Sequence, residues 1–246
     1  MRILVTGMSG TVGPRFAGAA RAVGHEVTPW SRAQVSPDDG DASQHLLDEL
    51  SPEAIVHMAF GAESWAGQLA GHARRDGIPF VFTSTTMVFA ARPNGPYTIS
   101  SPRTATDEYG AYKIRCEDAI WSANPDAMIA RLGYQIDPDG RGNNLVAHTD
   151  AQQAAGGTVR ASRRWIPACA FLDDTATALL SLVADPQSGL HHLDANARTA
   201  WSHARILHSL ADALGRSWEV VETDEPDHDQ RLTDSPRIAG LDTRLT

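Results

Sequence analysis

The strongest constraint on the fold is a glycine-rich turn between a short apolar run and an amphipathic segment. Residues 2–16 read RILVTGMSGTVGPRF, in which Gly7, Gly10 and Gly13 follow a strand-like run and precede a helical pattern. A strand, a tight turn and a helix in this order bring backbone N–H groups and the positive end of the helix dipole to one point. The stretch indicates an anion-binding turn of an α/β fold, or a packing turn without a ligand.

Short apolar runs alternate with longer amphipathic segments through the first half of the chain. Such alternation is typical of βαβ units. We therefore expect an α/β fold, a Rossmann-type doubly wound parallel sheet whose strand carboxyl ends share one edge, where ligands bind. The expected strands are residues 2–6, 25–29, 54–59, 79–84 and 127–132, and the expected helices are residues 15–23, 44–50, 63–76 and 109–122.

The alternation weakens after about residue 133, and DPDGRG at residues 137–142 is a turn-rich break. We expect residues 1–135 to form a nucleotide-binding domain that carries the catalytic residues. Residues 136–246 would form a small substrate-binding lobe, part of which returns to the sheet. In the lobe we expect helices over residues 173–184 and 202–214 and an exposed acidic loop over residues 222–234.

Composition excludes several classes of function. No apolar run approaches the roughly 20 residues that span a bilayer, and the net charge of −9 disfavours nucleic-acid binding. The two cysteines are too few for a disulfide framework, and the ten histidines lack a metal-ligand spacing, so no metal site is expected. The first strand begins directly after Met1, which leaves no room for a signal peptide, so a cytoplasmic protein is expected.

The end of the second expected strand bears on the choice of dinucleotide. Sheets of this kind place an acidic residue there when the ribose 2′-hydroxyl of NAD is bound. Residues 28–32 read TPWSR, and no carboxylate appears before Asp38. Ser31 and Arg32 could instead hydrogen-bond and pair with a 2′-phosphate, which favours NADP (NADPH) over NAD. The alternative is that Arg32 is a solvated residue at the start of a loop.

Two further segments carry residues suited to proton transfer. Tyr109 and Lys113 are four residues apart and lie on one face of an expected helix. A free tyrosine has a pKa of about 10, and a nearby ammonium favours the phenolate. Upstream, the run FVFTSTTMVF ends in hydroxyl side chains, so Ser84 or Thr85 could hydrogen-bond a reacting carbonyl oxygen.

The glycine turn, the hydroxyl strand end and the tyrosine–lysine pair resemble, in this order, the extended short-chain dehydrogenase/reductases of the NAD-dependent epimerase/dehydratase superfamily. The chain is most similar to the dTDP-4-dehydrorhamnose reductase branch, and the resemblance covers nearly all of it. The matching stretches are VTGMSGTVG, AIVHMAFGAE, STTMVF, YGAYKIRCED, GNNLV and FLDDTATALLSLV.

The resemblance implies an NADPH-dependent reductase of a keto group on a nucleotide-linked 4-keto-6-deoxy sugar. Thr85 would orient the substrate oxygen, Tyr109 would act as the acid, and Lys113 would tune Tyr109 and bind the nicotinamide ribose. Thr86 and Met87 stand where the dehydratases of the superfamily carry Asp-Glu, which argues against dehydration. Two alternatives stay open: a nucleotide-sugar epimerase with tightly bound NAD, and a non-catalytic cofactor-binding regulator.

The resemblance also assigns the remaining contacts. The helices over residues 63–76 and 109–122 pair in dimers of similar proteins, which makes a homodimer an expectation by analogy. Arg164 and Trp165 would contact a substrate diphosphate and base, or they form a solvated basic turn. Asn143 and Asn144 would bind sugar hydroxyls, or they cap a helix that begins at Leu145. The expected cofactor contacts are Gly7, Gly10, Thr11, Val12 and Gly13 at the pyrophosphate, and Ser31 and Arg32 at the 2′-phosphate. Asp41 and Ala42, in the place of the family's Asp-Leu pair after the third strand, would meet the adenine, and Ala59, Phe60, Gly61, Ser84, Tyr109 and Lys113 would lie along the ribose and phosphates. The expected substrate contacts are Thr85, Tyr134, Asn143, Arg164 and Trp165.

Overall fold

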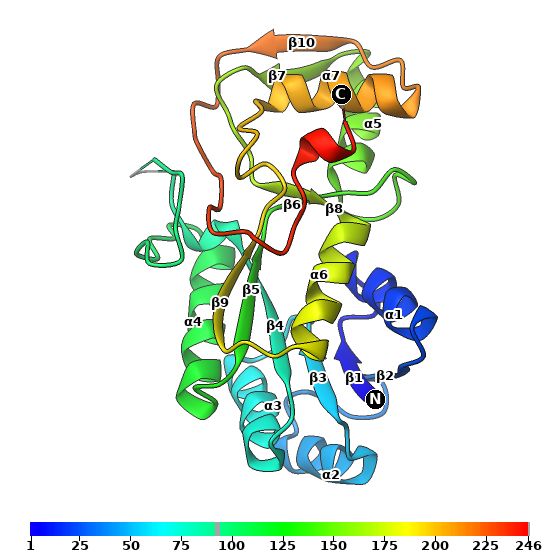
Figure 1. Cartoon of the computed structure of the whole chain (residues 1–246), viewed down its shortest axis with the longest axis vertical. Coiled ribbons are helices and arrows are strands. Elements are labelled where there is room, and N and C mark those ends of the chain that lie inside the picture. The colour runs from blue at the N-terminus through cyan, green and yellow to red at the C-terminus, as the bar shows by residue number, and fades with distance from the viewer. Residues whose placement is uncertain (92–93, 246) are drawn as a thin grey trace. The chain divides into compact units, whose positions relative to one another are not determined.

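The computed structural model describes residues 1–91 and 94–245, which form two compact units (Figure 1). The chain passes between the units more than once. Unit 1 comprises Met1–Val88, Ala105–Arg131 and Ala176–His191, and unit 2 comprises Phe89–Thr104, Leu132–Thr175 and His192–Thr246.

Unit 1 is built on a six-stranded sheet with the order β2-β1-β3-β4-β5-β9. Strand β1 pairs in parallel with both β2 and β3, and β3 pairs in parallel with β4. The strand order therefore reverses beside β1, where doubly wound sheets bind ligands. The expected Rossmann-type α/β fold is confirmed. The strands are β1 (Arg2–Thr6), β2 (Glu26–Pro29), β3 (Ala54–His57), β4 (Phe80–Thr85), β5 (Met128–Leu132) and β9 (Gly189–Leu193), and a 3-10 turn, η1 (Thr86–Val88), follows β4.

Helices on the two sides of the sheet strands begin and end at residues with clear local causes. Asp39 and Asp107 cap two helices by accepting hydrogen bonds from the backbone N–H groups of Ala42 and Gly110. Gly77 ends the third helix in the left-handed conformation, with φ +66°. The helices are α1 (Val12–Ala22), α2 (Gly40–Leu50), α3 (Glu63–Asp76) and α4 (Glu108–Ala123).

Helices α3 and α4 approach each other closely over the core of unit 1. A Cβ atom at Gly67 of α3 would lie 3.3 Å from the carbonyl oxygen of Ala119 in α4. The buried side chains beneath include Trp65 and Leu69 of α3 and Ile120 of α4. A larger residue at position 67 would therefore push the two helices apart.

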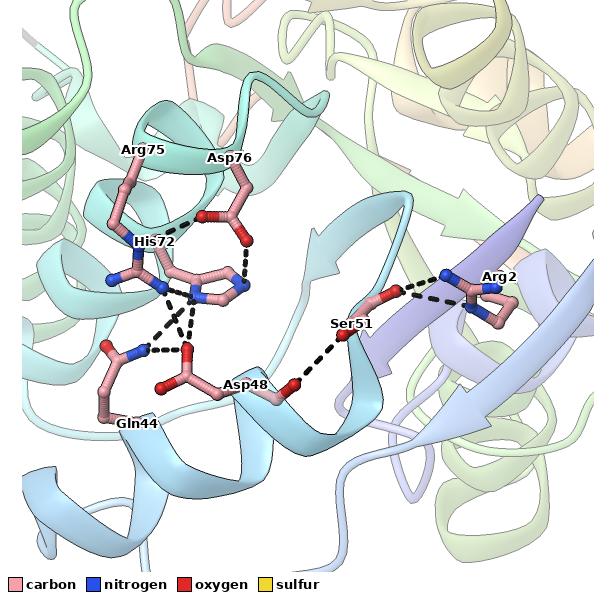
Figure 2. A network of polar contacts seen from close by, with 7 residues as sticks. All are labelled: Arg2, Gln44, Asp48, Ser51, His72, Arg75 and Asp76. Carbon is pink, nitrogen blue, oxygen red and sulfur yellow. Dashed lines mark hydrogen bonds and ion pairs between the residues drawn. The ribbon is translucent and has the colours of Figure 1, made fainter.

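A polar network joins α2 to α3 (Figure 2). The side chain of His72 is buried, and its Nδ1 atom accepts a hydrogen bond from Nη2 of Arg75 at 2.6 Å. Arg75 also pairs with Asp48 of α2 at 3.0 Å, and Nε2 of His72 lies 3.4 Å from Asp76. Burial is the main cause that lowers the pKa of His72. The imidazole is therefore neutral and serves as a packing link between the helices.

Unit 2 contains two small parallel pairs of strands, β6 with β8 and β7 with β10. None of these strands was expected from the sequence. The helices expected over residues 173–184 and 202–214 are confirmed as α6 and α7. The elements are β6 (Tyr134–Ile136), α5 (Leu145–Gly156), β7 (Val159–Ser162), β8 (Cys169–Phe171), α6 (Leu172–Ala184), α7 (His203–Leu214), β10 (Val220–Thr223) and the 3-10 turn η2 (Leu241–Thr243). Helix α6 and strand β9 have residues in both units.

The expectation that residues 222–234 form an exposed loop holds for the first part of the segment, where Asp224, Glu225 and Pro226 are exposed, but not for its second part. Leu232 is buried, and its backbone N–H donates to Oδ2 of the buried Asp194 at 2.9 Å. The other oxygen, Oδ1, accepts from the N–H groups of Cys169 at 3.0 Å and Asn196 at 2.8 Å. Burial raises the pKa of Asp194 to about 7, against the opposing effect of these donors. The part of the segment around Gln230 and Leu232 is therefore packed inside unit 2, although its composition is polar.

None of the helices in the described ranges combines the length and apolar character needed to cross a membrane. In those same ranges, no group of three or more histidine, cysteine or acidic side chains is arranged to hold a metal ion.

Candidate active site

The glycine turn after β1 is closed by contacts that only glycine allows. Gly7 has φ +82°, and a Cβ atom there would lie 2.8 Å from the carbonyl carbon of Met58. A Cβ atom at Gly13 would lie 2.4 Å from the carbonyl oxygen of Gly7, which also accepts a hydrogen bond from Gly10 N at 3.0 Å. Helix α1 begins at Val12 directly after this turn, with Thr11 as its N-cap. The first N–H groups of a helix have no intrahelical partner, so the turn presents donors suited to an anion.

A hydrogen-bonded pair fixes the ends of β1 and β3 beside the turn. The hydroxyl oxygen of Thr6 accepts from the N–H groups of Met58 and Ala59 at 3.0 and 3.1 Å, and lies 2.8 Å from Nδ1 of His57. Burial lowers the pKa of His57 to about 3, so the ring is neutral. Because Thr6 already accepts twice, its proton points to Nδ1, which places the ring proton of His57 on Nε2.

Tyr109 lies in the first turn of α4 and contacts the end of β4. Its side chain is partly exposed, at 40%, and its hydroxyl lies beside that of Thr85. Burial raises the pKa of Tyr109 while the Thr85 hydroxyl opposes the rise, so the phenol holds its proton at neutral pH. A Cβ atom at Gly110 would lie 2.1 Å from the carbonyl oxygen of Met87. Gly110, which the sequence reasoning missed, therefore lets α4 approach the end of β4.

Lys113 lies one turn after Tyr109 and is almost completely buried, with 4% exposure. Its Nζ atom donates to the carbonyl oxygen of Thr83 at 2.8 Å and lies 4.5 Å from the centre of the Phe82 ring. Desolvation lowers the pKa of Lys113 to about 8, and the nearby Glu117 opposes this effect. The ammonium is thus held by the strand that carries Thr85.

An aromatic group borders Tyr109 on the side of β3. Phe60 is 57% exposed and stacks on Tyr112, with ring centres 5.2 Å apart and an interplanar angle of 12°. Its ring centre is 5.6 Å from that of Tyr109. The Tyr112 hydroxyl donates to the carbonyl oxygen of Gly61 at 2.9 Å and accepts from its N–H at 3.1 Å. Tyr112 therefore holds residues 59–61 against α4, so that this stretch lies beside Tyr109.

Ser84 and Thr85 were both candidates for the hydroxyl that orients a reacting oxygen. The Ser84 hydroxyl donates to Oε1 of the buried Glu117 at 2.6 Å. Thr85 is the residue that meets Tyr109. The sequence reasoning missed Glu117, although a carboxylate four residues after Lys113 on a buried helix face was a visible signal.

Four residues were expected at the adenine end, and their contacts with a cofactor stay predictions. Arg32 is exposed, and its guanidinium carbon lies 5.8 Å from the centre of the Trp65 ring. Ser31 lies directly before it, after β2. Asp41 and Ala42, which stand in the place of the family's Asp-Leu pair, do not follow a third strand, and their contact with the adenine stays a prediction. They lie in the first turn of α2, before β3, because no strand forms between β2 and α2.

Of the residues expected to contact substrate, Thr85 lies in unit 1, and Tyr134, Asn143, Arg164 and Trp165 lie in unit 2. Tyr134 and Trp165 meet edge to face, with ring centres 5.3 Å apart, and the indole N–H of Trp165 donates to Gln230 at 3.3 Å. Arg164 pairs with Asp227, and Arg163 pairs with Asp224 at 2.7 Å. The basic turn is therefore largely neutralised by acidic side chains of the same unit.

Two adjacent asparagines have different roles in unit 2. Asn144 caps α5 by accepting a hydrogen bond from the N–H of Ala147 at 3.0 Å, so the capping alternative is confirmed for Asn144. Asn143 is exposed, and its Oδ1 lies 2.7 Å from Nε2 of His148. Asn143 remains a candidate for substrate contact.

A family model described as RmlD substrate binding domain matches residues 1–235. The chain belongs to this family. It is 26% identical to a dTDP-4-dehydrorhamnose reductase of Burkholderia thailandensis, over 97% of the chain and 86% of that protein. It is also 26% identical to a 2′-dehydrokanamycin reductase of Streptomyces kanamyceticus, over 97% of the chain and 74% of that protein.

A solved structure shares the fold of this family member. The dTDP-4-dehydrorhamnose reductase of Bacillus anthracis, crystallised in complex with NADP, superimposes with a TM-score of 0.79 at 17% identity, over 94% of the chain and 89% of that protein. The resemblance to the extended short-chain dehydrogenase/reductases and their dTDP-4-dehydrorhamnose reductase branch is confirmed. The chain is therefore a reductase of this type, as the motifs predicted.

Proposed function

We propose that the protein is an NADPH-dependent reductase of a keto group on a nucleotide-linked 4-keto-6-deoxy sugar. The observation that carries the proposal is the placement of the Tyr109 hydroxyl beside Thr85 at the end of β4, with the buried ammonium of Lys113, bound to the carbonyl oxygen of Thr83, one helical turn away. This arrangement provides a proton donor, a group that orients an oxygen, and a fixed positive charge.

The residues of unit 1 fit a dinucleotide. The cradle formed by Gly7 and Gly13 has no room for side chains, and α1 begins beside it, which suits a pyrophosphate. Arg32 is exposed and Ser31 is adjacent, as recognition of a 2′-phosphate requires. When bound, NADPH supplies the hydride that reduces the substrate carbon. The NADP found in the Bacillus anthracis reductase supports this choice of cofactor.

The mechanism assigns one role to each candidate catalytic residue. Thr85 donates a hydrogen bond to the substrate oxygen and orients it. Tyr109, which holds its proton at neutral pH, transfers that proton to the oxygen as negative charge develops there. Lys113 then stabilises the resulting phenolate through its charge.

The substrate class rests on the relatives and on the aromatic pair of unit 2. Both curated relatives are named as reductases of sugar-containing compounds. Tyr134 and Trp165 offer ring faces on which a nucleobase or sugar can stack. Asn143 can hydrogen-bond sugar hydroxyls, whereas Arg164 contacts a diphosphate only if it shares its pairing with Asp227.

The experiment measures NADPH oxidation with nucleotide-linked keto sugars, an aminoglycoside ketone and free keto sugars. The proposal requires turnover with a nucleotide-linked sugar, and requires Tyr109→Phe to lower kcat by about 10²-fold or more while NADPH affinity is kept. An epimerase would instead retain NAD through purification and return a product of unchanged oxidation level. Failure to bind NADPH or to reduce any of these ketones would refute the proposal.

The homodimer stays a prediction, which sedimentation can test.

A further inference from the structure

A buried ion pair lies between α4 and the sheet of unit 1. Glu117 is 0% exposed and Arg131, on β5, is 1% exposed. Arg131 donates to both carboxylate oxygens, from Nε to Oε1 at 3.0 Å and from Nη2 to Oε2 at 2.7 Å. Ser84 of β4 donates to Oε1 at 2.6 Å. One carboxylate therefore joins a helix to two neighbouring strands.

The stability of the fold does not require a charged pair at this place. Well-packed apolar side chains of similar volume often stabilise a core as well as, or better than, a buried ion pair, because both charges lose their hydration. What the pair adds is direction, since a two-pronged contact between a guanidinium and a carboxylate fixes the relative position of both groups.

The three linked residues lie next to the candidate catalytic residues. Glu117 is one turn after Lys113 and two turns after Tyr109, so all three share one face of α4. Ser84 directly precedes Thr85. The hydrogen bond from Ser84 to Glu117 thus connects the helix that carries Tyr109 to the strand that carries Thr85.

We propose that Glu117 is a positioning residue of the reductase, which fixes α4 against β4 and so keeps the Tyr109 hydroxyl in contact with Thr85. The inference rests on the proposed function only for its effect on turnover, because the Tyr109–Thr85 contact exists in the protein alone. A displacement of about 1 Å can lower a rate by about 10²-fold, so a small shift of α4 is enough to matter.

The electrostatic surroundings point the same way. Cys116 and Glu117 of its own helix raise the pKa of the buried Lys113, Glu117 is paired with Arg131 of β5, and the charge of Lys113 in turn lowers the pKa of His57 on β3. The carboxylate of Glu117 raises the pKa of Lys113 against the effect of burial. Loss of the pair would therefore change the pH profile of turnover as well as its rate.

The test compares two variants that remove the linkage in different ways. Glu117→Met combined with Arg131→Met removes both charges and keeps the volume filled, so it is expected to fold. Ser84→Ala removes only the connection to β4. We expect kcat to fall at least about 10-fold in the double variant and by a smaller factor in Ser84→Ala, with an altered pH profile and NADPH affinity kept within about threefold. The matched control is Arg115→Gln, which breaks the exposed pairs of α4 with Glu63 and Glu108 and should leave kcat unchanged.

A crystal structure of the double variant decides the inference independently of turnover. We expect the hydroxyl groups of Tyr109 and Thr85 to lie farther apart than in the parent. A folded double variant that keeps the parent distance, or that keeps the kcat and pH profile of the parent, would overturn the inference. If the parent itself reduces no ketone, the proposed function fails, while the crystal structure still decides the role of Glu117.

Discussion

The Nζ atom of Lys113 donates a hydrogen bond to the carbonyl oxygen of Thr83 at 2.8 Å. This contact places the charge of α4 on the backbone of β4, two residues before Thr85. We therefore expect the lysine to act on Tyr109 through its positive charge when the phenolate forms. Its protonation state should consequently control activity.

Turnover should decline on the alkaline side. Burial lowers the pKa of Lys113 to about 8, so the ammonium is present below that pH and is lost above it. We expect kcat/KM for ketone reduction to be constant near neutrality and to fall above about pH 8, approaching tenfold per pH unit. Because Lys113 is also an expected contact of the nicotinamide ribose, NADPH affinity is measured over the same range to separate a loss of binding from a loss of turnover. A profile that stays flat to about pH 10 would contradict the role of Lys113.

The lowered pKa of Lys113 should make the folded protein more stable at alkaline pH, where turnover declines. Because the unfolded lysine keeps its proton to a higher pH than the folded one, the free energy of unfolding gains a contribution that rises with pH above about 8. Replacement by methionine should remove this contribution. Urea denaturation of the parent and of Lys113→Met at several pH values would measure it.

Two glycines of α1 should respond in opposite ways to alanine. Gly13→Ala places a methyl group 2.4 Å from the carbonyl oxygen of Gly7, so we expect NADPH affinity to fall at least about tenfold and stability to fall by about 1–3 kcal/mol. Gly18 is exposed and has no atom within 4 Å of the added methyl, so Gly18→Ala should raise stability by about 0.5–1 kcal/mol. Equal effects of the two changes on cofactor affinity would contradict the pyrophosphate assignment. Thermal unfolding measures the change in stability, and fluorescence titration measures the change in NADPH affinity.

Arg32 should discriminate between the two dinucleotides. Removal of its charge in Arg32→Ala is expected to weaken NADPH binding by about 10- to 100-fold, since a hydrogen bond to a charged group contributes about 1.5–3 kcal/mol. NADH binding should change little. Arg74→Ala, which removes an exposed charge from α3, is the control for a general electrostatic effect. If both dinucleotides weaken equally, Arg32 does not read the 2′-phosphate.

Asp194 should make the stability of the protein depend on pH. Its folded pKa of about 7 lies above the ordinary 3.8, so its stabilising contribution is full below about pH 4 and is lost as the pH rises through 7. In Asp194→Asn this dependence should vanish, although absolute stability falls because the amide nitrogen accepts no hydrogen bond. The difference in unfolding free energy between parent and variant should change by at most about 1.4 kcal/mol per pH unit. A constant difference between pH 4 and 7 would contradict the raised pKa.

Elements with local signals were predictable from the sequence. Helix α3 has the expected bounds, because its apolar spacing ends at Gly77, whose left-handed conformation stops a helix. Helix α7 likewise begins after the capping Ser202 and ends before Gly215. Helix α1 begins before the expected residue 15, because Pro14 is tolerated in a first turn, where no N–H donor is needed.

Features that depend on contacts between distant residues were not predictable. Residues 222–234 contain few apolar side chains, yet the N–H of Leu232 reaches Asp194 across 38 residues. The strands of unit 2 are three or four residues long, too short to show an alternating pattern. At the candidate site, the sequence placed Tyr109, Lys113 and Thr85 correctly on α4 and β4, but could not pair Glu117 with Arg131 without the fold.

The close approach of α3 and α4 at Gly67 has a consequence for mutational screening. Helix α3 contains none of the candidate catalytic residues, yet a side chain at position 67 would press on the carbonyl of Ala119 and displace the helix that holds Tyr109. In a library scored by turnover, position 67 would therefore be recorded as an active-site position. A parallel count of folded protein would show that the loss is one of alignment between two helices.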